Sequence, residues 1–322
     1  MTVSPPTDRI PNRPPDAGSN WPPGLPSDGE ILGRMAGENF PVATALLGSR
    51  LRGRLVALYG WARLVDQLGD DYPGDRLAAL AWVDAELTRA LSDPTDGTVH
   101  PLVRRAALLV GDANADPDLL RDLIRANQVD QTAGTYATFG DLVEYCRLSA
   151  NPVGRLVLAV FDATTPERAA WSDDICTALQ IAEHCGDVAE DAAAGRVYLP
   201  AEDLDRFEVD PGTLAGPGPA SPRLRGLICF EAARARRILI DGQPLVGSLR
   251  GRSRLTVAGF VAGGHAALDA LADAGFDPLN GAPRPRTRRL LVHTATLLGG
   301  ALGGGSLPAH SRGPAEGARV QP

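Results

Sequence analysis

The chain has 322 residues, of which 44% are hydrophobic and only 5% aromatic, so leucine, valine and alanine must form most of its core. Its formal net charge of −7 argues against non-specific nucleic-acid binding, but not against an anionic substrate, because bound cations and a few arginines can reverse the local charge. Four cysteines without CxxC spacing indicate reduced thiols. The sequence shows neither a signal peptide nor an apolar run of roughly 18 residues, so we expect a cytoplasmic protein without a transmembrane helix.

In chain order, the sequence predicts a disordered tail, one long helical domain and a second tail. Residues 1–28 contain Pro-Pro three times and bury too little apolar surface to fold. Residues 29–280 follow a helical pattern with weak strand signals, which predicts a single all-α domain. Residues 281–322 mix Gly, Pro and Arg and predict a partly disordered C-terminal tail. The expected helices cover residues 30–36, 41–48, 51–69, 75–91, 100–111, 116–132, 138–149, 153–162, 167–193, 221–241 and 252–274.

The predicted helix that begins at residue 51 carries a polar stripe. Its members, Tyr59, Arg63, Asp66 and Asp70, recur at steps of three or four and therefore share one face. Apolar residues surround the stripe, as in a buried helix, so we expect it to face an internal cavity. The alternative is an exposed stripe in which Arg63 and Asp66 form an ordinary surface ion pair, and this helix alone does not decide between the two.

The predicted helix over residues 167–193 carries a second polar stripe, formed by Gln180, Glu183, Asp187 and Asp191. Both stripes contain two aspartates one turn apart, and such pairs buried together would repel each other strongly without cations. We therefore expect either a site of oxygen ligands suited to Mg²⁺ between the two helices, or helices that do not face each other. His184 lies beside the stripe and is expected to pack or cap rather than to bind metal.

A third segment, residues 141–158, places Pro152 inside a helical pattern. Proline removes a backbone hydrogen bond and kinks or breaks a helix. The small residues Ser149, Ala150 and Gly154 leave room beside the backbone at this point, which would suit the floor of a cavity. A kinked core helix with close packing explains the same residues equally well.

Four blocks of sequence resemble the head-to-head isoprenoid synthases, the squalene and phytoene synthases, and are most similar to the bacterial hydroxysqualene synthase branch of hopanoid pathways. The similarity extends from about residue 30 to 275, and the block at residues 145–155 is its most specific part. There are departures at Gln67, Glu183 and Gly186. The blocks are residues 38–43, 59–71, 145–155, and 187–191 together with 195–200.

The resemblance implies an all-α isoprenoid-synthase fold, a single helical bundle around a central cavity, with about three Mg²⁺ ions holding a prenyl diphosphate. It implies catalytic roles for Tyr59, Arg63 and Tyr145, of which Tyr145 would hold a water or only close the cavity. The metal ligands implied are Asp66, Asp70, Glu183, Asp187 and Asp191. The substrate-binding residues implied are Phe40, Ser149, Val153, Gln180, Arg196 and Tyr198.

The expected activity is a lyase- or transferase-like conversion of presqualene diphosphate to hydroxysqualene without NADPH, functionally coupled to a presqualene diphosphate synthase and a hydroxysqualene reductase. One alternative is condensation of two prenyl diphosphates to squalene or phytoene. A second is a non-catalytic partner that binds prenyl lipids, which the three departures favour and the four motif aspartates oppose. The basic cluster at residues 284–289 suggests peripheral contact with the inner membrane face, although a solvated tail explains it as well.

Overall fold

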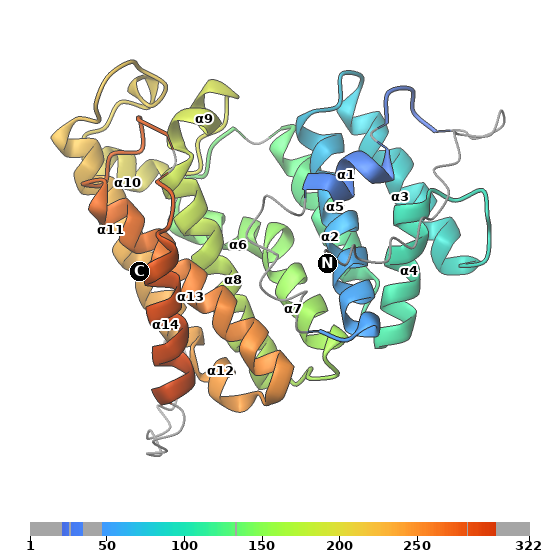
Figure 1. The fold of residues 1–322 in the computed structure, drawn as a ribbon. Helices are drawn as coiled ribbons and strands as arrows, with labels where there is room; N and C mark the ends of the chain where they lie inside the picture. Colours follow the sequence, from blue (N-terminus) through green and yellow to red (C-terminus); the bar gives the residue numbers. More distant parts are fainter. Residues whose placement is uncertain (1–20, 26, 35–46, 133, 282, 301–322) are drawn as a thin grey trace, which may run out of the picture.

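The computed structural model describes residues 21–25, 27–34, 47–132, 134–281 and 283–300, and in these ranges every regular element is helical. Figure 1 shows α1 to α5 on one side and α8 to α14 on the other, with α6 and α7 between them. The all-α prediction is therefore confirmed. The elements are α1 (Asp28–Arg34), α2 (Ser49–Asp70), α3 (Arg76–Ser92), α4 (Pro101–Ala113), α5 (Asp118–Asp130), α6 (Phe139–Ser149), α7 (Asn151–Val160), α8 (Pro166–Gly186), α9 (Val188–Ala193), α10 (Ala201–Arg206), η2 (Pro211–Thr213), α11 (Pro222–Gly242), α12 (Pro244–Ser248), α13 (Gly251–Asp273) and α14 (Thr287–Gly300).

Several long helices begin at a hydroxyl residue followed by proline or a capping carboxylate. Thr165 caps α8 and Ser221 caps α11 by accepting a hydrogen bond from a backbone N–H of the first turn, and a proline follows each cap. At the start of α6, Thr138 and Asp141 form a reciprocal capping box. These local signals explain why the sequence pattern locates most long helices to within a few residues.

The buried residues form two hydrophobic clusters. The N-terminal cluster is built mainly from α2, α3 and α4, and the C-terminal cluster mainly from α8, α11 and α13. The helix α7 contributes to both, since Leu156 and Val157 belong to the N-terminal cluster and Leu158 to the C-terminal one. The two acidic helices α2 and α8 therefore belong to different clusters.

The helix α13 is long and apolar enough, by length and composition alone, to cross a membrane. However, 61% of the most apolar 18-residue stretch of α13 is buried inside the protein, where the helix packs against α8, α11 and α14. This core position accounts for the apolar composition of α13. No other helix in the described ranges is both long and apolar enough to cross a membrane.

The close approach of α11 to α8 gives a prediction about stability. A Cβ added at Gly242 would lie 2.7 Å from the carbonyl oxygen of Trp171 and 2.7 Å from Ile175 Cγ1, so the backbone of α8 would have to move. We expect Gly242→Ala to lower the free energy of unfolding by roughly 1–3 kcal/mol, the usual cost of overpacking. Gly263→Ala in α13 is the matched control, because nothing lies within 4 Å of its added Cβ, and it should be neutral or mildly stabilising. Thermal or urea unfolding of both variants measures the difference; equal stability would contradict the close packing.

Both predicted tails differ from the structure at their inner ends. Residues 21–25, which the predicted N-terminal tail includes, contact the helical domain: the Trp21 ring packs on His100 at 4.7 Å, and the Tyr72 hydroxyl donates to the Pro23 carbonyl at 3.2 Å. In the C-terminal tail, residues 287–300 form α14, which ion pairs attach to α13. Residues 1–20 and 301–322, together with most of the predicted helix at 41–48, lie outside the described residues.

The predicted helix over residues 167–193 is divided at Asp187 into α8 and α9. Asp187 has φ −100° and ψ 13°, outside the helical region, although its N–H still donates to the Glu183 carbonyl. Glycine at position 186 weakens the helix just before this point. The predicted break at Pro152 is confirmed, since α6 ends at Ser149 and α7 begins at Asn151.

Candidate active site

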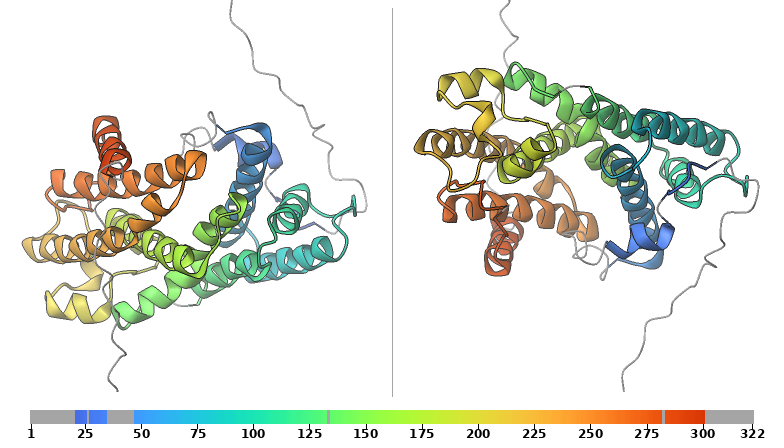
Figure 2. Two further views of the ribbon diagram at one scale, coloured as in Figure 1. Left: turned by 90° about the horizontal axis from the view of Figure 1, so that it is seen from below. Right: turned by 90° about the horizontal axis from the view of Figure 1, so that it is seen from above.

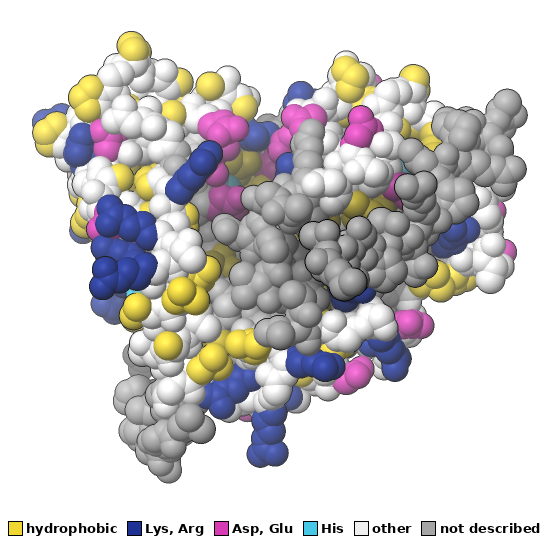
Figure 3. Space-filling view, in the orientation of Figure 1, with side chains coloured by type: hydrophobic (Ala, Val, Ile, Leu, Met, Phe, Trp, Pro, Cys, Tyr) yellow, Lys and Arg dark blue, Asp and Glu magenta, His cyan; other side chains and the backbone are white. Residues whose placement is uncertain are grey.

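Carboxylates from α2, α8 and α9 face one another between the two groups of helices. Asp66 and Asp70 lie in the last turns of α2, and burial, the Asp70 charge and, as a smaller contribution, the charge of Glu183 on α8 raise the pKa of Asp66. Arg196 bridges the two sides, with Nη1 2.6 Å from Asp70 Oδ1 and Nη2 3.9 Å from Asp191 Oδ1. Figure 3 shows Asp and Glu side chains on both sides of a hollow at the top of the molecule. Arg196 therefore connects the two stripes, and the Arg63–Asp66 ion pair of the alternative interpretation is present as well.

Burial and like charge both disfavour ionisation in this cluster. Burial, followed by repulsion from Asp70, raises the pKa of Asp66 to about 6, against the opposing effect of Arg63. Burial, followed by repulsion from Glu183 and Asp191, raises the pKa of Asp187 to about 6. Both carboxyls would gain from a cation between the helices, because a cation favours their charged form.

The donor set fits Mg²⁺, since Asp66, Asp70, Glu183, Asp187 and Asp191 offer only carboxylate oxygens, and Mg²⁺ is commonly held by one or two carboxylates with waters and substrate phosphates. Within the described residues, no three His, Cys, Asp or Glu side chains converge to hold a metal unaided. The carboxylates stand on two acidic walls: the α2 wall carries Asp66 and Asp70, and the α8–α9 wall carries Glu183, Asp187 and Asp191. Asp66 and Asp70 already accept hydrogen bonds from arginines. The site thus suits a metal that is bound together with an anionic ligand.

Two arginines supply positive charge at the acidic walls. Arg63 Nη1 donates to Asp66 Oδ2 at 2.6 Å, as expected for residues one turn apart, and Arg196 Nη1 donates to Asp70 Oδ1 at 2.6 Å. Both guanidinium groups can form charge-assisted hydrogen bonds with diphosphate oxygens. Tyr59, the remaining member of the first stripe, is buried on α2 two turns before Asp66.

A cluster of tyrosines is attached to one carboxylate beside the acidic walls. The hydroxyl groups of Tyr145 and Tyr198 donate to opposite oxygens of Asp130, at 2.6 Å and 2.9 Å. The Tyr136 ring packs against both tyrosines, with ring centroids 5.3 Å and 5.7 Å away. Burial and the nearby Asp130 charge raise the pKa of Tyr145 above its usual range, so this phenol stays protonated at neutral pH.

Asp130 was missed by the sequence reasoning. It is the last residue of α5 and lies one turn after the buried Ala126, so it continues the buried stripe of that helix. A carboxylate on the buried stripe of a helix indicates a polar partner inside the protein, because buried charges are rarely left unpaired. This pattern in the sequence could have identified Asp130 as a site residue. Burial raises the pKa of Asp130, while the two tyrosine hydrogen bonds and Arg196 lower it.

His184 packs within the site, as the sequence predicts. Its ring stacks on Tyr198 at a centroid distance of 3.8 Å and an interplanar angle of 13°. One ring nitrogen lies 3.3 Å from Gln180 Nε2 and the other 3.8 Å from Asp191 Oδ2. These contacts bring Gln180 to the same place as Tyr198, although the two residues are far apart in the sequence.

The α6–α7 break carries two of the predicted substrate-binding residues. The Ser149 hydroxyl is buried and makes no hydrogen bond, so it would gain from a polar ligand or a water. Val153 is half-buried and packs against the N-terminal cluster. Phe40 lies outside the described residues, and the apolar tunnel that would join these positions stays a prediction.

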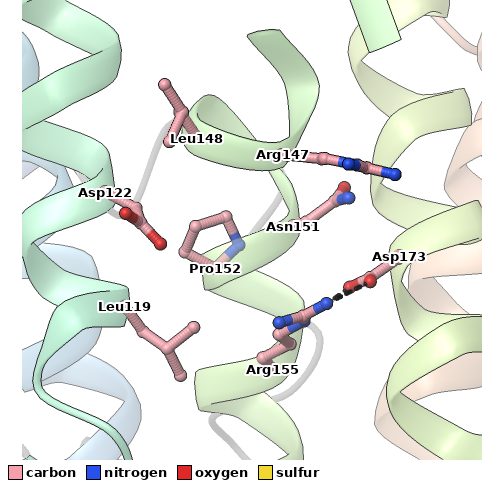
Figure 4. Close-up of a pocket in the computed structure, with 8 residues that line it drawn as sticks. All are labelled: Leu119, Asp122, Arg147, Leu148, Asn151, Pro152, Arg155 and Asp173. Carbon is pink, nitrogen blue, oxygen red and sulfur yellow. Dashed lines mark hydrogen bonds and ion pairs between the residues drawn. The ribbon is translucent and has the colours of Figure 1, made fainter. Parts of the chain in front are cut away.

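One hollow of about 310 Å³ adjoins the site behind Asp130 and Arg196, with backbone of Gly134 and Gly195 on its wall. A second hollow of about 310 Å³, between α5, α7 and α8, is lined by none of the predicted site residues, although Leu148, Asn151 and Pro152 on its wall flank Ser149 and Val153 in the sequence (Figure 4). In the second hollow Arg155 donates to both oxygens of Asp173, at 2.9 Å and 2.6 Å. This pair neutralises both charges and joins α7 to α8, which indicates a structural role.

Comparison with known proteins finds relatives of this chain. The profile of the squalene/phytoene synthase family matches residues 34–293. A hydroxysqualene synthase from Rhodopseudomonas palustris is 34% identical over 218 residues, which cover 66% of this chain and 72% of that protein. A phytoene synthase from Mycobacterium bovis is 28% identical over 229 residues, covering 70% of this chain and 74% of that one. The crystal structure of a squalene synthase from Alicyclobacillus acidocaldarius has a TM-score of 0.69 and 36% identity, and covers 78% of this chain and 95% of that chain.

Proposed function

The chain belongs to the squalene/phytoene synthase family, and we propose from this premise that it converts presqualene diphosphate to hydroxysqualene with release of diphosphate. The C–O bond to diphosphate breaks, the cation rearranges, and a water oxygen bonds to carbon as the water loses a proton. No hydride donor is needed for this sequence of bonds. The proposal takes the product from the hydroxysqualene synthases among its relatives.

The observation that carries the proposal is the meeting of two acidic walls with an arginine on each. Arg63 and Arg196 now bond to Asp66 and Asp70 and can transfer those hydrogen bonds to diphosphate oxygens. Mg²⁺, on which the family generally depends, would be held by the acidic walls and would neutralise charge on the leaving group. The arginines thus orient the diphosphate and favour its departure.

The tyrosine cluster supplies the other half of the proposed chemistry. The Tyr145 oxygen keeps a lone pair after donating to Asp130, so it can accept a hydrogen bond from the attacking water. Since the phenol stays protonated, it can take a proton from that water only by passing its own to Asp130. Ser149 and Val153 would border the prenyl chain and limit the entry of further water.

Product analysis tests the proposal. The chain is incubated with Mg²⁺, with and without NADPH, and, in separate reactions, with presqualene diphosphate, farnesyl diphosphate or geranylgeranyl diphosphate, and the lipid products are identified by mass spectrometry. We expect hydroxysqualene from presqualene diphosphate without NADPH. Squalene from farnesyl diphosphate, or phytoene from geranylgeranyl diphosphate, with no hydroxysqualene would overturn the product assignment and leave the family intact.

Two alternatives have specific support. Phytoene synthases match the chain nearly as well as hydroxysqualene synthases, which favours condensation of two prenyl diphosphates as the second candidate. Glu183, Gly186 and Gln67 depart from the family pattern and favour a non-catalytic prenyl-lipid-binding partner. Absence of diphosphate release from every substrate would support that partner role. For the active enzyme we propose a cytoplasmic location and coupling to enzymes that make presqualene diphosphate and reduce hydroxysqualene.

A further inference from the structure

The outer face of α14 is apolar where a surface helix is normally polar. Leu291 and Val292 are 65% and 56% exposed, and Ala295 and Thr296 continue the same stripe one turn later. The other exposed large hydrophobic side chains in the described ranges, Leu77, Leu108 and Ile240, are 46–51% exposed, and no two of them are adjacent. Neighbouring exposed aliphatic side chains of this kind mark interaction surfaces more often than isolated ones do.

Arginines border this apolar stripe at its N-terminal end. Arg284, Arg286 and Arg288 are exposed, and residues 281–300 contain four arginines and no acidic residue. The nearest acids are Asp269 and Asp273 of α13; Arg289 pairs with both, and Arg286 reaches Asp273 only at 3.9 Å. Figure 3 shows a dense group of Lys or Arg side chains at the left of the molecule, with hydrophobic side chains below it. A chain with a net charge of −7 therefore has a local positive pole on this side.

The face is held in place by polar contacts on the inner side of α14. Asp269 accepts hydrogen bonds from Arg236 of α11 and pairs with Arg289 and His293 of α14. Near the other end, Arg254 of α13 donates to the Leu298 carbonyl at 2.8 Å. Figure 2 shows α14 standing outside α13, with no other helix beyond it. The apolar stripe is thus presented by a fixed helix and need not form on binding.

We propose that this surface, consisting of Arg284, Arg286, Arg288, Leu291 and Val292, docks the protein on an anionic lipid bilayer. Arginines at the edge of an apolar helix face bind lipid phosphates, while aliphatic side chains enter the boundary between headgroups and acyl chains. A single convex helix with two large apolar side chains suits a deformable bilayer better than the rigid groove of a protein partner. The proposal does not depend on which prenyl product the chain makes.

Co-sedimentation of the full chain with vesicles tests the proposal. We expect binding to phosphatidylcholine vesicles that contain phosphatidylglycerol, much weaker binding to phosphatidylcholine alone, and loss of binding at high salt. The triple variant R284Q/R286Q/R288Q should weaken binding by on the order of 100-fold, since each basic residue near an anionic surface contributes about fivefold. Leu291→Asp should weaken it by roughly tenfold or more.

Leu77→Asp on α3 is the matched control, because Leu77 is 47% exposed but lies outside this surface. It should bind vesicles as the unchanged protein does, and all variants should keep the same thermal unfolding, since the altered side chains are exposed. Failure of the unchanged protein to bind anionic vesicles, or equal binding by all variants, would overturn the proposal. Self-association abolished by Leu291→Asp without vesicle binding would assign the face to a second copy of the chain instead.

Discussion

Asp66→Asn is expected to reduce Mg²⁺-dependent release of diphosphate by on the order of 1000-fold, and at the same time to stabilise the metal-free protein above pH 6. The rate falls because several kcal/mol of charge stabilisation depend on metal bound by this carboxylate, and each ~1.4 kcal/mol is a factor of ten. Steady-state assays of diphosphate release with saturating substrate measure the first effect. Thermal unfolding without metal, followed across pH, measures the second.

The direction of the stability effect follows from the raised pKa of Asp66. Burial raises that pKa from its usual 3.8 to about 6, so between these values the folded state binds more protons than the unfolded chain. The stability of the metal-free protein therefore falls as pH rises from about 4 to 6, and the whole penalty is present above pH 6. Asparagine carries no charge and removes this part of the penalty. Because the side chain is 44% exposed, solvent reduces the size of the effect but not its sign.

Glu144→Gln is the control for Asp66→Asn. Glu144 and Arg147 form the same kind of ion pair one turn apart as Arg63 and Asp66, but on an exposed surface away from the site. This variant should change neither the rate nor the pH dependence of unfolding. Near-normal diphosphate release by Asp66→Asn would refute a metal-binding role for the α2 wall.

The second large effect is expected from Asp130→Asn, which should lower kcat by roughly 100-fold, the order of loss seen when catalytic groups are displaced by about 1 Å. An amide cannot accept hydrogen bonds from both tyrosines in their present positions, because its nitrogen is a donor. Tyr145 or Tyr198 would have to turn away, although the acidic walls would be unaltered. Measuring kcat and KM for Asp130→Asn and Tyr145→Phe separates this loss from weaker substrate binding.

A double variant decides whether Asp130 acts through Tyr145. If it does, Asp130→Asn combined with Tyr145→Phe should be little worse than either change alone, because residues in one network are not additive. Tyr136→Phe is the matched control, since Tyr136 belongs to the same aromatic cluster but its buried hydroxyl makes no hydrogen bond. Losses that multiply in the double variant, or an equal loss in Tyr136→Phe, would leave Asp130 with a structural role only.

The sequence predicts most of the helical fold because the long helices are specified locally. Periodic apolar residues and caps such as Thr165 and Ser221 lie within the segments that they define. The short helices α10 and α12 were missed, since five or six residues are too few for a periodic pattern. The helix α14 was missed for another reason: Asp269 of α13 holds it through contacts between residues distant in sequence.

The candidate site also has a part that local sequence predicts and a part that depends on contacts between residues distant in sequence. Both acidic stripes could be read from residues one turn apart, whereas their meeting depends on how α2 packs relative to α8. Arg196 could be assigned to the site only through resemblance, and its bond to Asp70 joins residues on separate segments. Asp130 acquires its significance from Tyr145 and Tyr198, and no spacing along the chain relates these three residues.

The two hydrophobic clusters place the acidic walls on two bodies of helices that share α7. A ligand held by both walls would fasten these bodies together and stabilise each against unfolding of the other. The free protein could then lose its structure in two separate steps, whereas the ligand-bound protein would melt in one cooperative transition. Because the ligand would hold the two walls together, substrate entry and product release would require the walls to separate transiently. The turnover rate would then depend on this opening as well as on the chemical step.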